Sequence, residues 1–192
     1  MKYHAFYVNG NLLIRIKNKT TTKVEQVDNL VALYNDDEII GYNILDFKSD
    51  FVNDGLVDPN ENLTNEINDI LQKEQYPLLK TDFEEYIVVG YVKERENHPE
   101  SKKLSITKVD LGDEEVQIVC GAPNVDAGQK VVVAKIGAVL KDGTWIMPGK
   151  LLKVESNGMI CSKKELGLIQ DEPGIYVLDD SYEIGVPFIA KN

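Results

Sequence analysis

The chain has 192 residues, 43% of them hydrophobic and 28% charged, a composition that is ordinary for one large or two small globular domains. No apolar run approaches the ~20 residues needed to cross a bilayer, and the first residues lack the pattern of a signal peptide, so we expect a cytoplasmic protein. The net charge of −11 argues at first against a nucleic-acid partner, because phosphate binding usually leaves a basic footprint.

Charge is distributed unevenly along the chain, however. Residues 1–85 carry 8 Lys and Arg against 16 Asp and Glu, a balance of −8. Residues 93–164 carry 12 basic against 10 acidic side chains, a balance of +2. A local cationic face can therefore exist inside an acidic protein, and total charge alone does not exclude RNA.

Residues 1–80 are predicted to form an α+β domain. Asn9-Gly10 separates two alternating segments and is a strong hairpin signal, because both residues tolerate positive φ. A second strand pair and an amphipathic helix follow, with Asn62 as the expected N-cap. The predicted elements are strands at Tyr3–Val8, Leu12–Ile16, Val31–Tyr34 and Ile39–Leu45, and a helix with Leu63, Ile67, Ile70 and Leu71 on one face. No metal-ligand spacing, phosphate loop or nucleophile–base pair stands out in residues 1–85.

Residues 86–192 are dense in short β-rich segments separated by Gly, Asn, Asp and Pro. This spacing predicts a small barrel or a sandwich; a five-stranded OB barrel with peripheral strands fits the strand number, but periodicity does not choose between the two. Asp142-Gly143 is predicted to be a hairpin tip. The predicted strands are Glu85–Val92, Leu104–Val109, Val116–Cys120, Val131–Ile136, Lys150–Val154, Met159–Cys161 and Ile175–Leu178.

Cys120 and Cys161 are the two cysteines of the chain, with no CxxC spacing and only two histidines to join them in a metal site. They could form a disulfide, but in an intracellular chain we expect them to be reduced and buried. The sequence predicts no cofactor.

The segment 156–167 contains a recognisable local pattern. Ser162 and Glu165 have the S-x-x-E spacing of a capping box, in which the hydroxyl and the carboxylate satisfy each other's backbone donors. Gly167 then suits the left-handed position after a very short helix. Local chemistry alone favours a structural role for this segment, with Met159 as a core residue.

Residues 98–104 are predicted to form a polar loop before a strand. Lys102 and Lys103 are either part of a solvated surface or flexible ammonium groups that meet phosphates as point charges. His98 is expected to order this loop rather than to act as a base. Asn124, in a Gly/Pro/Asn turn, can hydrogen-bond nearby backbone or present its amide to a ligand.

These segments occur in an order that resembles a known domain. The series is Val89-Gly90-Tyr91-Val92, then His98-Pro99 with Lys103-Leu104, then Gln117–Ala122 with Asn124-Val125, and last Val154–Ser162 with Glu165-Leu166-Gly167. It closely resembles the tRNA-binding OB domain of the bacterial phenylalanyl-tRNA synthetase β subunit, a module that is also found in stand-alone tRNA-binding proteins. With its acidic N-terminal extension, the whole chain resembles the YtpR-type tRNA-binding proteins.

The resemblance implies non-catalytic binding of tRNA, recognised mainly by its shape. It implies that Lys103 contacts phosphate, while Asn124 and Ser156 offer hydrogen bonds to backbone or 2′-hydroxyl groups. The implied RNA-binding residues are Lys102, Lys103, Asn124, Lys153, Ser156 and Met159, and the implied site-shaping residues are Gly158, Ser162 and Glu165. The family commonly has an arginine and a glycine where this chain has Leu152-Lys153.

A second hypothesis is a protein-interaction module, in which the acidic residues 1–80 dock an aminoacyl-tRNA synthetase or another translation partner. The balance of −8 in the first 85 residues supports it. A homodimer is a further possibility, because stand-alone relatives are often dimers. An enzyme is poorly supported, since the chain has two histidines and no plausible nucleophile–base pair.

Overall fold

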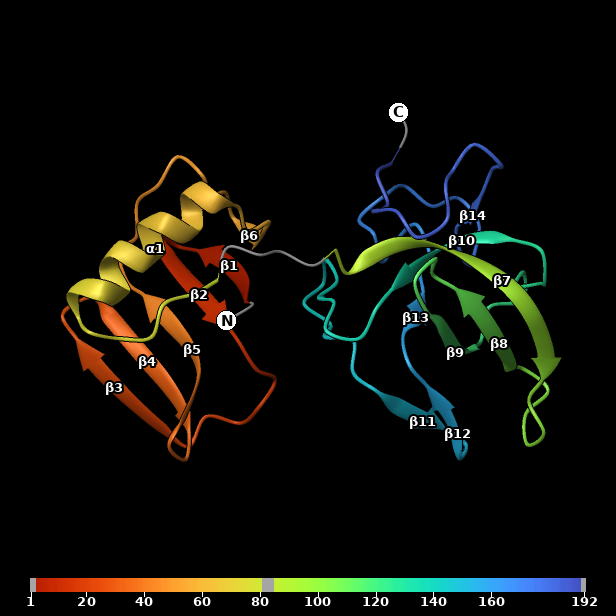
Figure 1. Cartoon of the computed structure of the whole chain (residues 1–192), viewed down its shortest axis with the longest axis horizontal. Helices are drawn as coiled ribbons and strands as arrows, with labels where there is room; N and C mark the ends of the chain where they lie inside the picture. The colour runs from red at the N-terminus through yellow and green to blue at the C-terminus, as the bar shows by residue number, and fades with distance from the viewer. Residues whose placement is uncertain (1–2, 81–84, 191–192) are drawn as a thin grey trace. The chain divides into compact units, whose positions relative to one another are not determined.

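The computed structural model describes residues 3–80 and 85–190. The chain divides into two compact units, Met1–Glu84 and Glu85–Asn192 (Figure 1). Each unit has a hydrophobic core of its own. Within the described ranges, no helix has the length and apolar character needed to span a membrane.

An antiparallel sheet of six strands forms the N-terminal unit, in the order β3-β4-β5-β2-β1-β6. The strands are β1 (His4–Val8), β2 (Asn11–Arg15), β3 (Lys23–Val27), β4 (Leu30–Asn35), β5 (Glu38–Ile44) and β6 (Gly55–Val57). Asn9 and Gly10 join β1 to β2 with φ angles of 50° and 78°, which confirms the predicted hairpin.

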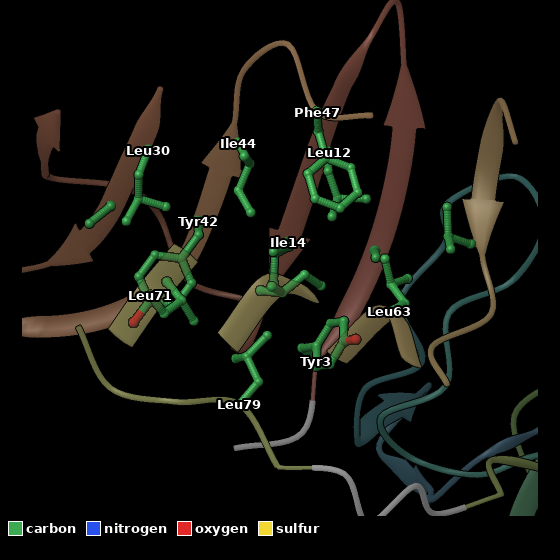
Figure 2. Packing of buried hydrophobic residues seen from close by; sticks show 14 residues of the cluster. Tyr3, Leu12, Ile14, Leu30, Tyr42, Ile44, Phe47, Leu63, Leu71 and Leu79 are labelled. Atoms are coloured by element: carbon green, nitrogen blue, oxygen red, sulfur yellow. The ribbon is translucent and has the colours of Figure 1, made fainter. Parts of the chain in front are cut away.

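Helix α1 (Glu61–Lys73) covers one face of this sheet (Figure 1). Figure 2 shows the core between them, to which both layers contribute fully buried side chains. Leu63 and Leu71 come from the helix, and Leu12 and Tyr42 from the sheet. Four of these side chains are 0% exposed, so burial of apolar area is the main stabilising contribution in this unit.

The helix is capped by Asn60, and the predicted cap at Asn62 is wrong. Asn60 has an extended backbone, with φ −135° and ψ 171°, and its side chain accepts a hydrogen bond of 3.0 Å from the Leu63 N–H. Asn62 already lies inside the first turn. Both asparagines are good capping residues, but only the first precedes the turn that brings Leu63 into the core.

The N-terminal unit contains more strand than the sequence predicted. The edge strands β3 and β6 were both missed, so the expected α+β domain is a mostly β unit with one helix. Four of the five residues of β3 are exposed, so its sequence lacks the half-buried alternation that identifies a strand.

The C-terminal unit is built on a sheet in the order β13-β10-β7-β8-β9, with β14 paired to the other end of β10. Its strands are β7 (Ile87–Asn97), β8 (Ser105–Asp110), β9 (Glu115–Cys120), β10 (Lys130–Ala134), β11 (Gly149–Leu151), β12 (Val154–Ser156), β13 (Met159–Ile160) and β14 (Val177–Leu178). β7 is long and shifts its register against β8 between Val92 and Glu94. Such an irregularity increases the local bend of a strand, which helps a sheet to curve around its own core.

The sheet curves into a nearly closed barrel, because β12 and the residue after it form hydrogen bonds with β9, the strand at one edge of the sheet. The Asn157 N–H donates to the Gln117 carbonyl over 2.8 Å, and the Val119 N–H donates to the Ser156 hydroxyl over 3.1 Å. We call this junction the β9–β12 closure. Side chains from β7, β8, β9, β10 and β13 fill the interior. Of the two architectures left open by the strand pattern, the structure has the barrel.

β11 and β12 form a hairpin where the sequence predicted one strand over Lys150–Val154. The chain reverses at Leu152 and Lys153, which have positive φ angles of 44° and 71°. Two-residue hairpin turns of this kind strongly favour Asn and Gly. The turn was missed because Leu-Lys carries neither of those signals.

Candidate nucleic-acid interface

His98 fixes the loop between β7 and β8. Its side chain is only 4% exposed, and both ring nitrogens have backbone partners. The Glu100 N–H donates to Nδ1 over 3.1 Å, so the proton is on Nε2, which donates to the Leu151 carbonyl over 3.2 Å. The ring therefore joins the 98–104 loop to strand β11, which confirms the predicted ordering role of His98.

Three of the predicted RNA-binding lysines lie on these two neighbouring segments. Lys102 and Lys103 are exposed, and their ammonium groups pair with no carboxylate among the described residues. Lys153, at the tip of the β11–β12 hairpin, pairs with Glu100 over 3.0 Å. The fold thus brings together cations that are about fifty positions apart in sequence, and one of them already has a counter-charge.

Ser162 and Glu165 form the predicted capping box. Glu165 Oε2 accepts from the Ser162 N–H over 2.6 Å and from the Ser162 hydroxyl over 2.7 Å, and the Glu165 N–H donates back to that hydroxyl over 3.3 Å. The residues that follow make hydrogen-bonded turns rather than the predicted short helix, and they end at Gly167 with φ 73°. The hydrogen bonds between Ser162 and Glu165 hold this segment in place, so it is ordered without a helix.

Ser156 and Gly158 act on the barrel itself. Ser156 is 6% exposed, and its hydroxyl both accepts from the Val119 N–H and donates to the Gly158 carbonyl. Gly158 has φ 142°, and a Cβ there would lie 3.1 Å from the Ala134 carbonyl oxygen. These contacts give both residues a part in the β9–β12 closure; direct contact of Ser156 with RNA stays a prediction.

Asn124 connects two loops. Its Oδ1 accepts from the Ile175 N–H over 2.9 Å, and its Nδ2 donates to the Ile175 carbonyl over 3.1 Å. Gly174 allows this approach, because a Cβ at its position would lie 2.4 Å from Asn124 Oδ1. One amide hydrogen of Asn124 remains for a ligand, while the rest of its side chain is engaged.

Met159 lies in a cleft of about 450 Å³. The lining comprises residues 119–123, Met159 and Ile160, Ser162, Glu165, and Gly174 with Ile175; we call it the Met159 cleft. Ser105 pairs with Cys120 across β8 and β9, and Leu104 packs against Gly121. The lysine-bearing 98–104 loop therefore leads directly to the edge of this cleft.

A second group of cations at this face was missed in the sequence. Lys163 and Lys164 lie between Ser162 and Glu165, both of which line the Met159 cleft. The Lys163 ammonium lies 4.9 Å from the centre of the Tyr176 ring, a cation–π distance. Two adjacent lysines can indicate a phosphate-binding surface, but in the sequence this segment was explained by its capping box, and the lysines were assigned no role.

Both cysteines are free thiols and buried, as predicted. Burial raises the pKa of the Cys161 thiol to about 12, with the Glu165 carboxylate adding to the shift, and burial also raises the pKa of Cys120. A raised pKa lowers the thiolate fraction, and only the thiolate is a good nucleophile. We expect neither thiol to be alkylated by iodoacetamide at pH 8 in the native protein, and both to be alkylated in urea, as measured by intact mass. Rapid labelling of the native protein would contradict this expectation.

The C-terminal unit matches a known domain family, and the whole chain matches a relative of similar length. The family model described as "Putative tRNA binding domain" matches residues 87–187. The chain is 42% identical to "Putative tRNA-binding protein YtpR" of Bacillus subtilis, over 96% of this chain and 98% of that one. It is 52% identical to the phenylalanine–tRNA ligase beta subunit of Nitratidesulfovibrio vulgaris, over 56% of this chain but only 14% of that subunit. A solved structure of a MetRS related protein from Pyrococcus horikoshii aligns with a TM-score of 0.41 and 26% identity, over 54% of this chain and 88% of that one.

The matches differ in how much of the chain they cover. The synthetase subunit shares only the C-terminal part, whereas the Bacillus subtilis protein shares both units. The acidic N-terminal unit therefore occurs with the barrel in a full-length relative. The chain belongs to the tRNA-binding domain family and, within it, to the YtpR-type tRNA-binding proteins.

Proposed function

We propose that the C-terminal unit is an OB-type barrel that binds tRNA without catalysis. The observation that carries the proposal is the convergence of separate segments on one face of a domain that matches the tRNA-binding family over residues 87–187. The 98–104 loop, the β11–β12 hairpin and the 162–165 capping box all lie around or beside the Met159 cleft. Because a protein that binds tRNA in translation works in the cytoplasm, the proposed function includes a cytoplasmic location.

Recognition of tRNA by shape fits this face. Lys102 and Lys103 at this face form no ion pair with the described residues, and single point charges of this kind contact phosphates without reading bases. The hydroxyl and amide groups of the site are mostly engaged in holding loops together, so sequence-specific hydrogen bonds are few. RNA helices are recognised mainly through backbone geometry and 2′-hydroxyls, which requires only this kind of surface.

Binding alone accounts for the similarity to synthetases. This chain spans 14% of the matched beta subunit, so the ligase activity named for that protein resides in a much larger molecule. The hypothesis that residues 1–80 dock a synthetase or another protein stays a prediction that rests on their acidic charge, as does a homodimer. A tRNA-binding role requires neither of them.

Replacement of Lys103 by alanine is expected to reduce the salt dependence of tRNA binding. Each ammonium that neutralises a phosphate releases about one counterion, so the slope of log K against log salt should become shallower by about one unit. The measurement is fluorescence anisotropy with bulk tRNA at several salt concentrations, on the full chain.

The matched control is Lys108→Ala. Lys108 lies on the outer side of β8 and pairs with Glu94 over 2.7 Å, so its removal changes net charge equally but should leave the slope within error of wild type. Equal effects of the two substitutions would mean that only net charge acts, which argues against a phosphate contact at Lys103. Absence of any tRNA binding at low salt would refute the proposed function.

A further inference from the structure

We propose that the Met159 cleft receives one unpaired base of the bound RNA, and that Glu165 selects a base that presents N–H donors. The proposal rests on the proposed function and extends it from shape recognition to a defined contact. It assigns a second role to the carboxylate of the capping box, since Glu165 belongs to the lining of the cleft.

The hydrogen bonds of Glu165 leave one of its oxygens available. Both bonds from Ser162 end on Oε2, and Oε1 accepts none from the described residues. An ionised carboxylate has about four acceptor positions, so roughly two remain on Oε1. Ser162 already holds the side chain in place, and a ligand would therefore gain a charge-assisted hydrogen bond without ordering a flexible glutamate.

The charge of this carboxylate decides which part of RNA can enter. A phosphate beside Glu165 would place two anions together in a partly enclosed space, which is unfavourable. A base is neutral and carries N–H groups on its Watson–Crick edge. The cleft therefore suits a base and repels the backbone that carries it.

Size and lining support the same occupant. A volume of about 450 Å³ falls within the roughly 300–1,000 Å³ typical of small-molecule sites, and far below what a helical stem requires. About half of the wall surface is apolar, and Ala122 and Pro123 on one loop and Ile175 on another contribute to it. The thioether of methionine is polarisable and favours contact with aromatic rings, so Met159 suits contact with the ring of a base.

Cations at the edge of the cleft suit the phosphates on both sides of an extruded base. Lys103 precedes Leu104, which packs on Gly121 in the cleft wall. Lys163 and Lys164 directly follow Ser162, which belongs to another part of the lining. A carboxylate in the lining, with lysines next to lining residues in sequence, thus matches a nucleotide whose base points inward and whose phosphates stay outside.

Among the four bases, guanine suits the Glu165 carboxylate best. Its N1–H and exocyclic amino group are adjacent donors on one edge, and both can approach a single carboxylate. Adenine and cytosine offer an amino group beside an acceptor, and uracil offers one N–H between two acceptors. We therefore expect the affinity of the cleft to be highest for guanine and lowest for uracil.

The test compares five-nucleotide RNAs, UUGUU, UUAUU, UUCUU and UUUUU, titrated into isotope-labelled full-length protein and followed by NMR. UUGUU is expected to bind about tenfold more tightly than UUUUU, the effect of one charge-assisted hydrogen bond. UUGUU should also shift the amide signals of Gly121, Ser162 and Glu165 more strongly than UUUUU does, a readout that needs no variant.

Glu165→Gln is the decisive variant, because a capping box accepts either Glu or Gln at this position. The glutamine oxygen can keep the Ser162 bonds while its amino group faces the cleft and meets guanine donors with a donor. The preference for UUGUU over UUUUU should fall to within about twofold, while UUUUU binding stays near wild type. Glu183→Gln removes the same charge from an exposed position outside the cleft and should keep the preference.

The base site is overturned if wild type binds all four RNAs equally, or if Glu165→Gln retains the guanine preference. Either result can occur while bulk tRNA still binds with the expected salt slope, and the proposed function then stands without the base site. A guanine preference in the absence of tRNA binding would support the cleft and refute tRNA as the partner.

Discussion

Replacement of Gly158 by alanine is expected to lower the melting temperature of the C-terminal unit by roughly 10 to 20 °C. A φ of 142° is a conformation that residues with a Cβ rarely adopt, at a cost of about 1–3 kcal/mol. The added methyl would also lie 3.1 Å from the Ala134 carbonyl oxygen and 3.3 Å from Ile118 Cδ1. A loss of about 3 kcal/mol corresponds to a shift of this size in a domain of about 100 residues.

The measurement can follow one unit alone, because the single tryptophan, Trp145, belongs to the C-terminal unit. Its fluorescence during heating gives the melting temperature of the barrel within the full chain. Gly149→Ala is the matched control, since the nearest atom to its added Cβ is 4.0 Å away and its φ is not positive. Equal melting temperatures for the two variants would show that the backbone at residue 158 accepts a Cβ without loss of stability.

Replacement of His98 by alanine is expected to weaken tRNA binding by about tenfold and to destabilise the C-terminal unit by about 2–3 kcal/mol. The substitution removes the partners of the Glu100 N–H and the Leu151 carbonyl and leaves a gap where a buried ring was. The 98–104 loop would lose its connection to β11, so Lys102 and Lys103 would have to be ordered by the RNA at a cost in entropy. Tryptophan-monitored urea unfolding and tRNA anisotropy measure the two effects.

Glu100→Gln is the comparison for His98, because it changes the same loop and retains the Glu100 N–H that donates to the ring. It breaks the exposed ion pair with Lys153, and such pairs contribute little to stability. Stability should remain near wild type, while tRNA affinity should rise by a few fold as the Lys153 ammonium becomes available. A His98→Ala protein with unchanged stability and affinity would mean that the loop is held by other contacts.

Local patterns carried most of what the sequence could predict. Asn9-Gly10 adopts its hairpin, and Ser162 with Glu165 forms its capping box, because each depends on residues at most three positions apart. Most strands of the C-terminal unit were recognised from short β-rich runs between turn residues, but the β11–β12 hairpin was predicted as one strand. In each case the physical cause lies within the segment itself, which is why a single sequence is sufficient.

Contacts between residues far apart in the sequence could not be predicted from local patterns. His98 meets Leu151 and Lys153 meets Glu100 over separations of 53 residues, and Asn124 meets Ile175 over 51. Each side chain had several plausible partners in sequence, and only the curvature of the barrel selects one. The internal hydrogen bonds of Asn124 and Ser156 belong to this group; the family resemblance identified both residues, but it did not indicate how their polar atoms are engaged.

The β9–β12 closure has a thermodynamic consequence. One edge of the barrel is joined there by a main-chain hydrogen bond, the Ser156 hydroxyl and the Gln117 side chain, which donates to the Glu155 carbonyl, rather than by a full ladder. An RNA held both by Lys103, in the loop before β8, and by the 162–165 segment, which follows β13, would connect separate parts of the barrel, so that binding and folding are linked equilibria. A ligand at 100 times its dissociation constant adds about 2.7 kcal/mol to the free energy of unfolding. Cellular tRNA would then act as a thermal stabiliser of the barrel, and the purified unit would be its least stable form.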